Sequence, residues 1–524
     1  MTMKRRIGFT VRLVGTFLIL LICILSLGLY FSVKWLETTY KGITMREIVF
    51  HMRMPLDGTS VELKKSFINM VVIPLFKPSI FLLVIHLVLI FIPLVLYDQI
   101  SGRQWQVSKS ALKLLKLMII SGSFMLILLS VDSLVLNFRF DDFLKGNFQR
   151  TDIYTREYIH PSKVKFTFPK RKRNLVFILL ESIESTFFRE ADGGYYTEDL
   201  MPELRKIALE NIHFSHTESL GGAAQVSGTG WTVGALVAHL LGIPLILPIH
   251  GNAHEGYDRF LAGAVGLTDI LATAGYQQRF LIGSDKKFAG RDTLFKTHGN
   301  VLVKDLLYYK ENGKIPKDYH VWWGFEDEKL YALAKKELLE LSSHTDPFNL
   351  MLLTVDTHHV GGYVCRLCKN EFDTQYKNVI ACASRQIASF VHWIQSQIWY
   401  ENTTIVIMGD HLYMDGNFIP YGANRRVYNV FINSLAMPVR TRNRQFSSLD
   451  TFPSILDSLG VDYAGPGLAL GRSLFKDTET LLEKYGIEYV NKEIVKNNKE
   501  YDSFLYDRTT MDFSLKKGLS FLGY

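Results

Sequence analysis

Three long apolar stretches stand out in the N-terminal part of the chain. They are Leu13–Val33, Pro78–Tyr97 and Leu117–Leu136, and each contains at most one charged or histidine residue. An α-helix rises ~1.5 Å per residue, so ~20 apolar residues cross the ~30 Å hydrocarbon layer of a bilayer. The pattern therefore predicts three transmembrane helices, which form a membrane anchor over residues 1–136. Two alternatives are weaker: a cleaved signal peptide for the first stretch, which no small-residue cleavage site follows, and a core helix for the third, which Asp132 interrupts.

Basic residues next to these stretches predict how the chain is oriented in a membrane, because positive charges favour the cytoplasmic side. Four precede the first stretch and four lie between the second and the third: Lys4, Arg5, Arg6 and Arg12, then Arg103, Lys109, Lys113 and Lys116. The loop between the first two stretches is basic as well, but its four acids and its length dilute that signal. The rule places the N-terminus in the cytoplasm and, after an odd number of spans, the C-terminal part on the other side.

Beyond residue 136 the pattern changes to short apolar runs that alternate with helix-like segments. Such runs are typical of strands buried on both faces of a parallel sheet. They cover Asn174–Leu180, Gln278–Gly283, Phe348–Val355 and Thr403–Met408. The helix-like segments are Met201–Glu210, Thr232–Leu241, Glu326–Ser342, Ser384–Trp399 and Ser447–Leu459. Alternating strands and helices predict one α/β domain with a mainly parallel sheet.

The predicted α/β domain covers residues 174–480. Residues 137–173 are polar, contain Pro161 and Pro169 as breakers, and predict a linker or extended arm. The charged, tyrosine-rich residues 481–524 predict a C-terminal tail or a surface helix.

Composition and net charge change this picture little. Hydrophobic residues make up 48% of the chain and the mean hydropathy is +0.09, as expected for a protein with a membrane anchor. The formal net charge of +8 comes partly from the flanks of the apolar stretches. The basic run Lys170–Arg173 is most simply a solvated loop, with contact to anionic lipid headgroups as the alternative. Basic and aromatic residues are not interleaved, so no nucleic-acid partner is expected.

The four cysteines divide between the two predicted parts of the chain. Cys23 lies in the first apolar stretch, where inert packing is expected. Cys365, Cys368 and Cys382 fall in the predicted exported domain, in which disulfides persist. The C-x-x-C pair could indicate zinc, but no second C-x-x-C or histidine pair follows at finger spacing. One disulfide with a third thiol left over is therefore favoured.

Acidic residues and histidines follow three of the four predicted strands. They are Glu181-Ser182 after the first, Asp356-Thr357-His358-His359 after the third, and Gly409-Asp410-His411 after the fourth. Because the carboxyl ends of parallel strands meet at one edge of a sheet, we expect these side chains to converge. Asp, Glu and His with hydroxyl oxygens suit a divalent ion such as Mn²⁺, Mg²⁺ or Zn²⁺. A lone aspartate at a strand end is often a helix cap, but three strand ends together predict a metal site.

A helix preceded by small residues offers a candidate nucleophile. Ser227, Gly228 and Gly230 allow a tight turn, and the helical pattern begins at Thr232. The hydroxyl of a residue at a helix N-terminus can simply cap the helix. It can also act as a nucleophile, since the helix dipole and an adjacent metal favour its alkoxide. A metal site at the same sheet edge favours the nucleophile, with Thr229 as the second candidate.

Five short motifs occur in a fixed order after residue 180: ES (181–182), GTGWT (228–232), FAGRD (288–292), DTHH (356–359) and GDH (409–411). This ordered set resembles the lipoteichoic acid synthase and phosphoglycerol transferase branch of the sulfatase/alkaline-phosphatase superfamily, to which phosphoethanolamine transferases of lipopolysaccharide are related. The resemblance covers roughly residues 150–480. It implies a multi-pass protein of the bacterial inner membrane whose sulfatase-like catalytic domain is periplasmic.

The resemblance also implies roles for individual residues. Glu181, Thr232, Asp410 and His411 match the ligands of one catalytic ion, with Thr232 as the nucleophile. Arg291 matches an arginine that binds the substrate phosphate, although Ala289 stands where lipoteichoic acid synthases have a tryptophan.

Two further matches concern histidines and cysteines. His358 matches a histidine that contacts the substrate phosphate, and His359 is the alternative because Val360 replaces the proline of the family's H-x-P motif. Cys368 and Cys382 match a cysteine pair of phosphoglycerol transferases, which implies a disulfide between them.

The function implied is transfer of a phospholipid headgroup to an envelope glycan such as lipopolysaccharide core or periplasmic glucan. The donor is phosphatidylglycerol or phosphatidylethanolamine, and the GTGWT motif slightly favours the phosphoglycerol enzymes. Thr232 would form a covalent phospho-threonine, Arg291 would hold a non-bridging oxygen, and His358 would protonate or steady the leaving oxygen.

Two other classes of function compete with a transferase. A membrane-tethered phosphodiesterase would use the same intermediate with water as the acceptor. A non-enzymatic envelope protein would have no need for all four candidate ligands together. The chain lacks a C-x-P-x-R motif near residue 232, which argues against a sulfatase with a formylglycine nucleophile.

Overall fold

The computed structural model describes residues 3–40, 43–53, 61–86, 109–246, 259–415, 418–420 and 422–505. The chain divides into two compact units, and the first contains residues 1–45 and 60–141. The second unit contains residues 46–59 and 142–524. The second unit thus begins close to the expected end of the anchor, but it also takes in a short segment from between the first two spans.

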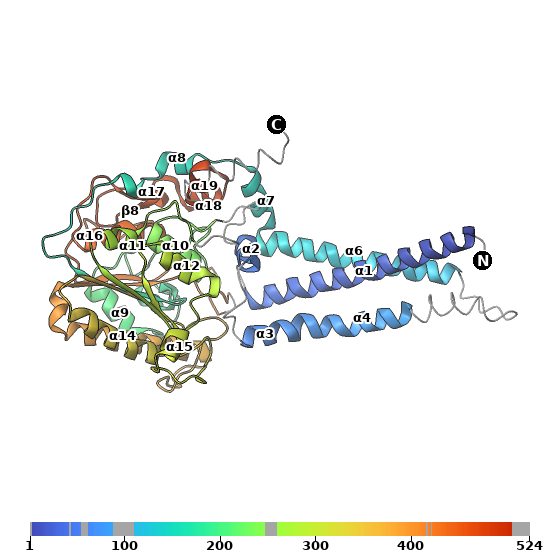
Figure 1. Ribbon diagram of the computed structural model, residues 1–524, viewed down its shortest axis with the longest axis horizontal. Coiled ribbons are helices and arrows are strands. Elements are labelled where there is room, and N and C mark those ends of the chain that lie inside the picture. The colour runs from blue at the N-terminus through green and yellow to red at the C-terminus, as the bar shows by residue number, and fades with distance from the viewer. Residues whose placement is uncertain are drawn as a thin grey trace. The chain divides into compact units, whose positions relative to one another are not determined.

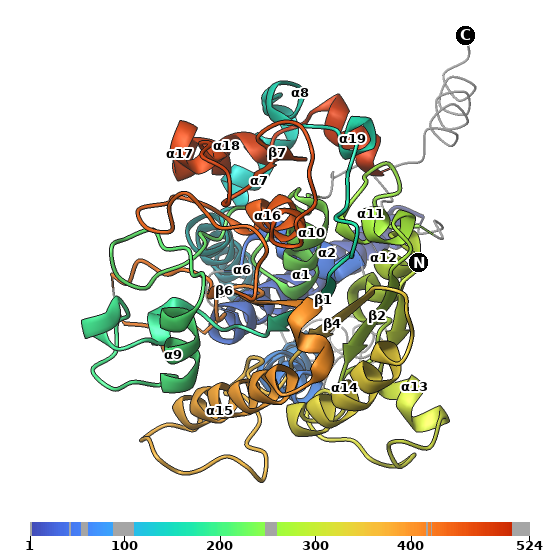
Figure 2. The same cartoon turned by 90° about the vertical axis from the view of Figure 1, so that its left-hand side faces the viewer.

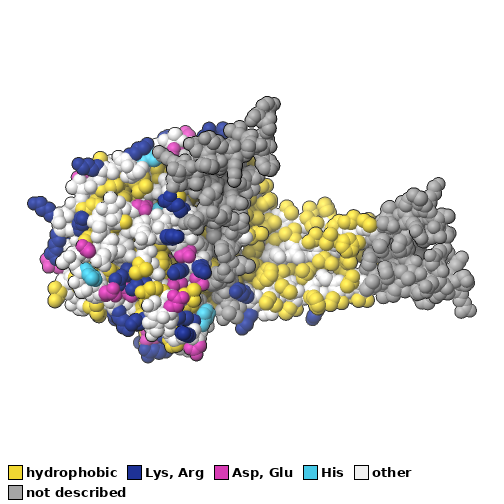
Figure 3. Space-filling view, in the orientation of Figure 1, with side chains coloured by type: hydrophobic (Ala, Val, Ile, Leu, Met, Phe, Trp, Pro, Cys, Tyr) yellow, Lys and Arg dark blue, Asp and Glu magenta, His cyan; other side chains and the backbone are white. Residues whose placement is uncertain are grey.

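The first unit is built of long apolar helices (Figure 1). They are α1 (Met3–Thr39), α3 (Val61–Phe67), a π-helical turn (Ile68–Val72), α4 (Ile73–His86) and α6 (Lys109–Phe138). Large apolar side chains cover their outer surface in Figure 3, and Leu25, Phe81 and Phe124 are 62%, 66% and 60% exposed. Exposing apolar surface to water costs ~25 cal/mol per Å², so this surface suits a lipid environment.

Among the described residues, three helical stretches of the first unit are long and apolar enough to cross a membrane: Phe17–Thr39, Leu63–Val84 and Lys113–Phe138. The second differs from the expected Pro78–Tyr97, whose residues from 87 onward lie outside the described part of the chain. The stretch Leu63–Val84 contains Lys64, Lys65 and Lys77, so it is not an uncharged run in the sequence. A helix tolerates such lysines because their long side chains can extend toward the polar interface.

The second unit contains a six-stranded sheet in the order β3-β2-β4-β1-β5-β6. Its strands are β1 (Asn174–Leu180), β2 (Gln277–Ile282), β3 (Leu302–Lys304), β4 (Phe348–Leu353), β5 (Thr403–Gly409) and β6 (Asn429–Ile432). The pairs among the first five are parallel, and β6 is antiparallel to β5. The predicted α/β fold with a mainly parallel sheet is therefore confirmed.

Helices cover both faces of this sheet, which explains its continuous apolar runs (Figure 2). Leu175, Phe177 and Leu179 of β1 belong to a core cluster with α10 (Thr232–Leu241), α11 (Leu267–Thr273) and α16 (Thr451–Ser458). The alternate residues of β1 belong to a second cluster with α9 (Pro202–Glu210), α14 (Asp327–Ser342) and α15 (Gln375–Gln395). Each fully buried side chain of this size contributes ~1.5–3 kcal/mol, so β1 is firmly held between the layers.

The remaining helices are short and lie around this frame. They are α7 (Phe140–Phe148), α8 (Ile153–Glu157), α12 (Arg291–Thr297), α13 (Leu306–Glu311), α17 (Leu481–Tyr485), α18 (Ile487–Ile494) and α19 (Lys499–Leu505). The last three lie in the segment for which a C-terminal tail or a surface helix was expected. Val490, Ile494 and Phe504 are buried in the same core cluster as α10, so the described residues 481–505 are part of the domain.

The helix α2 (Met45–Arg53) comes from between the first two spans and packs into the second unit. The ring of Phe50 is buried and its centroid lies 5.4 Å from that of Trp231. Arg46 donates a hydrogen bond of 3.0 Å to the carbonyl oxygen of Val495 and lies over the ring of Phe143. This segment therefore reaches the N-terminal end of α10, where the candidate nucleophile is located.

Candidate active site

The sheet brings three sequence-predicted residues together. Leu180 of β1 is paired with Gly409 of β5, so Glu181 and the pair Asp410-His411 leave adjacent strands side by side. The N–H of Asp410 donates to the carbonyl oxygen of Leu180 at 3.0 Å, which holds the first residues after the two strands next to each other. All three side chains are buried, and one ligand atom of each lies within 4.8 Å of the others. Parallel pairing thus makes a compact trio of potential ligands, which we call the carboxylate–histidine trio.

Hydrogen bonds orient the carboxylate–histidine trio toward one point. The N–H groups of Ser182 and His411 both donate to Asp410 Oδ1, at 2.8 and 2.7 Å. His411 Nδ1 lies 2.9 Å from the carbonyl oxygen of Leu412, which assigns its hydrogen to that side. Asp410 Oδ2 and His411 Nε2 are buried and have no hydrogen-bond partner among the described residues. Two buried polar atoms without partners indicate a site for a ligand.

The spacing of these atoms fits a metal ion. His411 Nε2 lies 3.4 Å from Glu181 Oε1 and 3.4 Å from Asp410 Oδ2. Ligand atoms bound tetrahedrally at ~2.1 Å from one ion are ~3.4 Å apart. An imidazole with two carboxylates suits Zn²⁺ or Mn²⁺ better than Mg²⁺, which prefers oxygen ligands. The trio can therefore hold a divalent cation.

Burial and mutual charge shift the pKa values of the trio in opposite directions. Burial raises the pKa of Asp410 to about 7, and the nearby Glu181 carboxylate adds to the shift. Burial alone would raise the pKa of Glu181, but His358 and His411 outweigh it and hold that pKa below its usual value. Burial would likewise lower the pKa of His411, but Asp410 and Glu181 raise it. The three groups therefore compete for protons, and a bound cation, which displaces protons from its ligands, would balance their buried negative charge.

Thr232 is the first residue of α10 and is only partly buried, whereas the rest of that helix is buried. The N-cap position belongs to Trp231, so the Thr232 hydroxyl does not cap the helix; it donates to Glu181 Oε2 at 3.4 Å. Thr229, the second candidate, is buried, and its hydroxyl donates to the carbonyl oxygen of Val226. The geometry therefore favours Thr232 as the nucleophile.

Two polar residues that the sequence did not indicate lie beside Gly230, two residues before Thr232. A Cβ atom at Gly230 would lie 2.7 Å from Gln225 Nε2 and 2.8 Å from Glu47 Oε1, so a side chain there would displace both. Gln225 accepts a hydrogen bond of 2.9 Å from the N–H of Leu412. Glu47 is buried in α2 and helps to raise the pKa of His411. Gln225 lies close to GTGWT in the sequence, but nothing in the sequence marks the distant Glu47.

Arg291 is a buried guanidinium at the start of α12. It donates to Ser284 Oγ at 3.2 Å and to the carbonyl oxygen of Asp285 at 2.6 Å, and it lies over the ring of Phe288. Its Nε is buried and has no hydrogen-bond partner in the described part of the chain. Burial lowers its pKa to about 10, while Asp285 and Glu181 oppose that shift. The side chain therefore stays charged at neutral pH, near the carboxylate–histidine trio.

The structure separates the two candidate histidines. Burial lowers the pKa of His358, Glu181 opposes that shift, and His411 and Arg291 add to it, so His358 lies within electrostatic reach of the site. Its ring is 4.5 Å from that of Trp323, and its Nδ1 contacts the carbonyl oxygen of the next residue. The ring of His359 lies against Tyr413 instead, with centroids 5.7 Å apart. His358 is therefore the better candidate.

Asp356, which precedes these histidines, does not join the carboxylate–histidine trio. Its N–H donates to Asp327 Oδ2 and its Oδ1 accepts from the N–H of Asp327, both at 3.1 Å. Burial raises the pKa of Asp327 to about 7 and that of Asp356 well above its usual range. These two carboxyls form a separate buried pair at the start of α14.

The three cysteines of the domain are free thiols in the structure. The sulfur of Cys365 lies 3.7 Å from that of Cys368 and 3.8 Å from that of Cys382. The disulfide expected between Cys368 and Cys382 is not formed here, and Cys365 is the thiol that contacts both.

Comparison with known proteins adds a family and a set of relatives. The model of the family described as Sulfatase matches residues 173–461, more than half of the chain. "Phosphoglycerol transferase I" of Escherichia coli O6:K15:H31 is 36% identical over 331 residues, which cover 61% of this chain and 41% of that protein. The protein of the same name from Shigella flexneri is 36% identical over 327 residues, 60% of this chain and 40% of that one. The chain spans about two fifths of the length of these curated relatives.

Solved structures show weaker likenesses. Lipooligosaccharide phosphoethanolamine transferase A from Neisseria meningitidis is 15% identical, with a TM-score of 0.49, and the match covers 86% of this chain and 84% of that one. The lipoteichoic acid synthase LtaP from Listeria monocytogenes is 16% identical, with a TM-score of 0.47, and the match covers 60% and 79%.

Proposed function

The chain belongs to the sulfatase family, and on that premise we propose that it is a membrane-anchored transferase of phospholipid headgroups. One observation carries the proposal: the partly exposed hydroxyl of Thr232 lies at a helix N-terminus beside the buried carboxylate–histidine trio. A hydroxyl so placed is suited to attack phosphorus, because the helix dipole and a cation held by the trio would favour its ionised form. The apolar helices of the first unit would keep the enzyme at the membrane that supplies its donor.

The trio and the oxygen of Thr232 would hold a divalent cation, Mn²⁺, Mg²⁺ or Zn²⁺, which supplies positive charge against the phosphodiester and favours ionisation of the hydroxyl. Asp410 Oδ2 and His411 Nε2, which have no hydrogen-bond partner among the described residues, support this assignment. Arg291 would bind a non-bridging oxygen of the phosphate through its guanidinium.

In the first half-reaction the Thr232 oxygen forms a bond to phosphorus and the bond to the diacylglycerol oxygen breaks. The Thr232 proton needs an acceptor, and the leaving oxygen needs a proton. The contact of His358 Nδ1 with a carbonyl oxygen assigns the hydrogen to Nδ1, so Nε2 of the neutral ring carries a lone pair. The lowered pKa of His358 favours that neutral ring. We therefore assign His358 to accept the threonine proton and pass it to diacylglycerol.

In the second half-reaction a sugar hydroxyl of the acceptor attacks the phosphorus of the phospho-threonine. A new bond forms from phosphorus to the sugar oxygen, the bond to Thr232 breaks, and the sugar proton returns to the threonine oxygen. The acceptor would be an envelope glycan such as lipopolysaccharide core or periplasmic glucan. The domain would face the periplasm of a bacterium, with the anchor in the inner membrane.

Phosphoglycerol is the first candidate for the transferred group, because the curated relatives at 36% identity are named phosphoglycerol transferases. Phosphoethanolamine is the second candidate, and Glu47 favours it. This buried carboxylate lies close enough to raise the pKa of His411. A carboxylate at that place would attract the ammonium group of an ethanolamine headgroup, and a glycerol headgroup offers no such charge.

The test uses the full chain in detergent micelles with phosphatidylglycerol or phosphatidylethanolamine carrying a labelled headgroup. After acid quenching, mass spectrometry should find the label on the peptide that contains Thr232, and transfer to added glycan should follow. Thr232→Ala should abolish both signals, whereas Thr232→Ser should keep part of them. Label on another residue would refute the assigned nucleophile. Release of free headgroup phosphate, without transfer to any glycan, would show a phosphodiesterase.

A further inference from the structure

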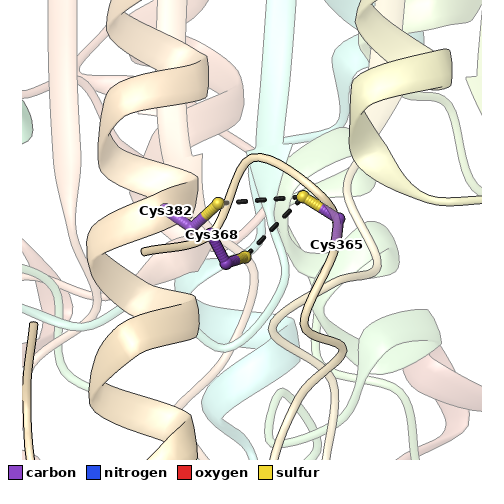
Figure 4. Close-up of side chains that lie close together, drawn as sticks. All are labelled: Cys365, Cys368 and Cys382. Carbon is purple, nitrogen blue, oxygen red and sulfur yellow. Dashed lines mark hydrogen bonds between the residues drawn. The ribbon is translucent and has the colours of Figure 1, made fainter. Parts of the chain in front are cut away.

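A second group of potential metal ligands lies apart from the carboxylate–histidine trio. Cys365 and Cys368 lie in the loop between β4 and α15, and Cys382 lies on α15 (Figure 4). Their sulfur atoms all lie within 4.8 Å of one another. We call this group the cysteine trio. It is not needed for the proposed transfer, so it calls for a separate explanation.

The distances within the cysteine trio fit a tetrahedral thiolate site. The sulfur of Cys365 is 3.7 Å from that of Cys368 and 3.8 Å from that of Cys382. With zinc–sulfur bonds of ~2.3 Å, two sulfurs of a tetrahedral site are ~3.8 Å apart. A disulfide would need ~2.05 Å and would leave one of the three thiols over. Packed thiols without an ion have a similar spacing, so the groups around the sulfurs must distinguish a metal site from simple packing.

The surroundings of the cysteine trio supply groups that a bound ion needs. The N–H of Cys368 donates to the carbonyl oxygen of Cys365 at 3.1 Å, which closes a turn that brings the two thiols together. The side-chain nitrogen of Gln386 lies 3.5 Å from the sulfur of Cys382 and 3.7 Å from that of Cys365. The other amide atom, Gln386 Oε1, is buried with no hydrogen-bond partner in the described ranges. Since the two ends of an amide are assigned rather than observed, a flipped Gln386 would direct an oxygen at the sulfurs.

We propose that Cys365, Cys368 and Cys382 bind a Zn²⁺ ion as three thiolates, with the amide oxygen of Gln386 as the fourth ligand. Binding releases three thiol protons and leaves a site with one net negative charge. All four tetrahedral positions belong to side chains, which is the mark of a structural zinc site rather than a catalytic one. Three sulfur ligands also select a thiophilic ion against Mg²⁺ or Mn²⁺.

Such an ion would fasten the loop that carries His358 to α15. The loop already contacts this helix: the Tyr376 hydroxyl donates to the carbonyl oxygen of Thr357 at 3.0 Å, and Gln375 donates to that of Gly362 at 2.9 Å. The cysteine trio adds a third fastening farther along the loop. The zinc site would thus position the histidine without touching the substrate.

The test measures zinc in the full chain isolated in detergent micelles. Asp410→Asn serves as the background, so that the carboxylate–histidine trio does not contribute. We expect about one zinc ion per chain, and at least about a 10-fold lower content after Cys365→Ser. Cys23→Ser, a thiol in the first unit, is the matched control and should keep the ion. Equal zinc content with and without Cys365 would overturn the proposal.

A second measurement avoids any change of the cysteines. Replacing zinc by Co²⁺ in the same background should give strong thiolate-to-metal charge-transfer absorption in the near ultraviolet. The isolated chain is also denatured with a thiol-alkylating reagent and weighed. Alkylation of all three domain cysteines supports the site. A mass ~2 Da below that of the reduced chain, with two of the three cysteines joined, would show a disulfide and overturn it.

Discussion

The two trios are made of different atoms and are assembled in different ways. The carboxylate–histidine trio comes from the ends of adjacent strands, whose register places Leu180 opposite Gly409. The cysteine trio joins a loop to a helix, and no strand holds its loop in place. The first offers oxygen and nitrogen, the second sulfur. The sulfur set excludes Mg²⁺ and Mn²⁺, whereas the oxygen and nitrogen set admits Mn²⁺ as well as Zn²⁺.

The trios also differ in what completes them. Beside the carboxylate–histidine trio lies Thr232, which is only partly buried. Beside the cysteine trio lies Gln386, a side chain of the protein itself. Catalytic metal sites keep a position open, and structural sites are closed. If both trios bind ions, the site at the strand ends would therefore be open to substrate and the loop site would be closed.

Next to the complete loss of transfer expected for Thr232→Ala, the largest effect should follow from Asp410→Asn. The amide keeps an oxygen for the N–H groups of Ser182 and His411 but removes the charge that a cation needs. Headgroup transfer from labelled phosphatidylglycerol should fall at least about 100-fold, while the cysteine trio keeps its zinc. Asp477→Asn changes an exposed acid and should leave transfer unchanged. Full transfer by Asp410→Asn would show that the carboxylate–histidine trio is not needed for the reaction.

The next effect concerns the buried Arg291. Hydrogen bonds to charged groups are worth ~1.5–3 kcal/mol, so Arg291→Ala should lower kcat/KM roughly 10- to 100-fold. The loss should appear mainly in KM for the lipid donor if the guanidinium binds the phosphate before the reaction. Arg440→Ala, at an exposed arginine, is the control. An unchanged KM with unchanged kcat would place the phosphate elsewhere.

Sequence patterns predicted the carboxylate–histidine trio well, and the reason is physical. Buried parallel strands are continuous apolar runs, and the first polar residues after them must lie at one sheet edge. Glu181, Asp410 and His411 could therefore be placed without a structure. The predicted start of a helix at Thr232 was also confirmed. It could be predicted because small residues followed by a helical pattern mark a helix N-terminus.

The sequence could not place groups that only tertiary packing brings in. Glu47 reaches the site from the segment between two spans, and nothing local marks it. The edge strands β3 and β6 are too short to leave a clear apolar run. The contact of Cys365 with both other thiols depends on how its loop folds over α15, which spacing does not reveal.

A smaller effect should follow from Cys365→Ser. If the cysteine trio is structural, transfer should fall only about 2- to 5-fold at low temperature, because the strand ends keep the other trio intact. The thermal midpoint of unfolding should fall, since a bound ion stabilises the folded chain by mass action. Cys23→Ser should change neither quantity. A loss of transfer as large as that of Asp410→Asn would mean that the cysteine trio takes part in the chemistry.

The smallest effect concerns the pair Asp327 and Asp356, whose pKa values burial raises. The folded chain holds a proton on Asp327 up to about pH 7, whereas the unfolded chain releases it near pH 4. Stability should therefore fall as pH rises from about 4 to 7, by at most ~1.4 kcal/mol per pH unit for one proton. Asp356→Asn removes one of the two charges and should flatten this dependence of the unfolding midpoint, whereas Asp477→Asn should not. Equal slopes in all three proteins would show that the pair stays ionised in the folded chain.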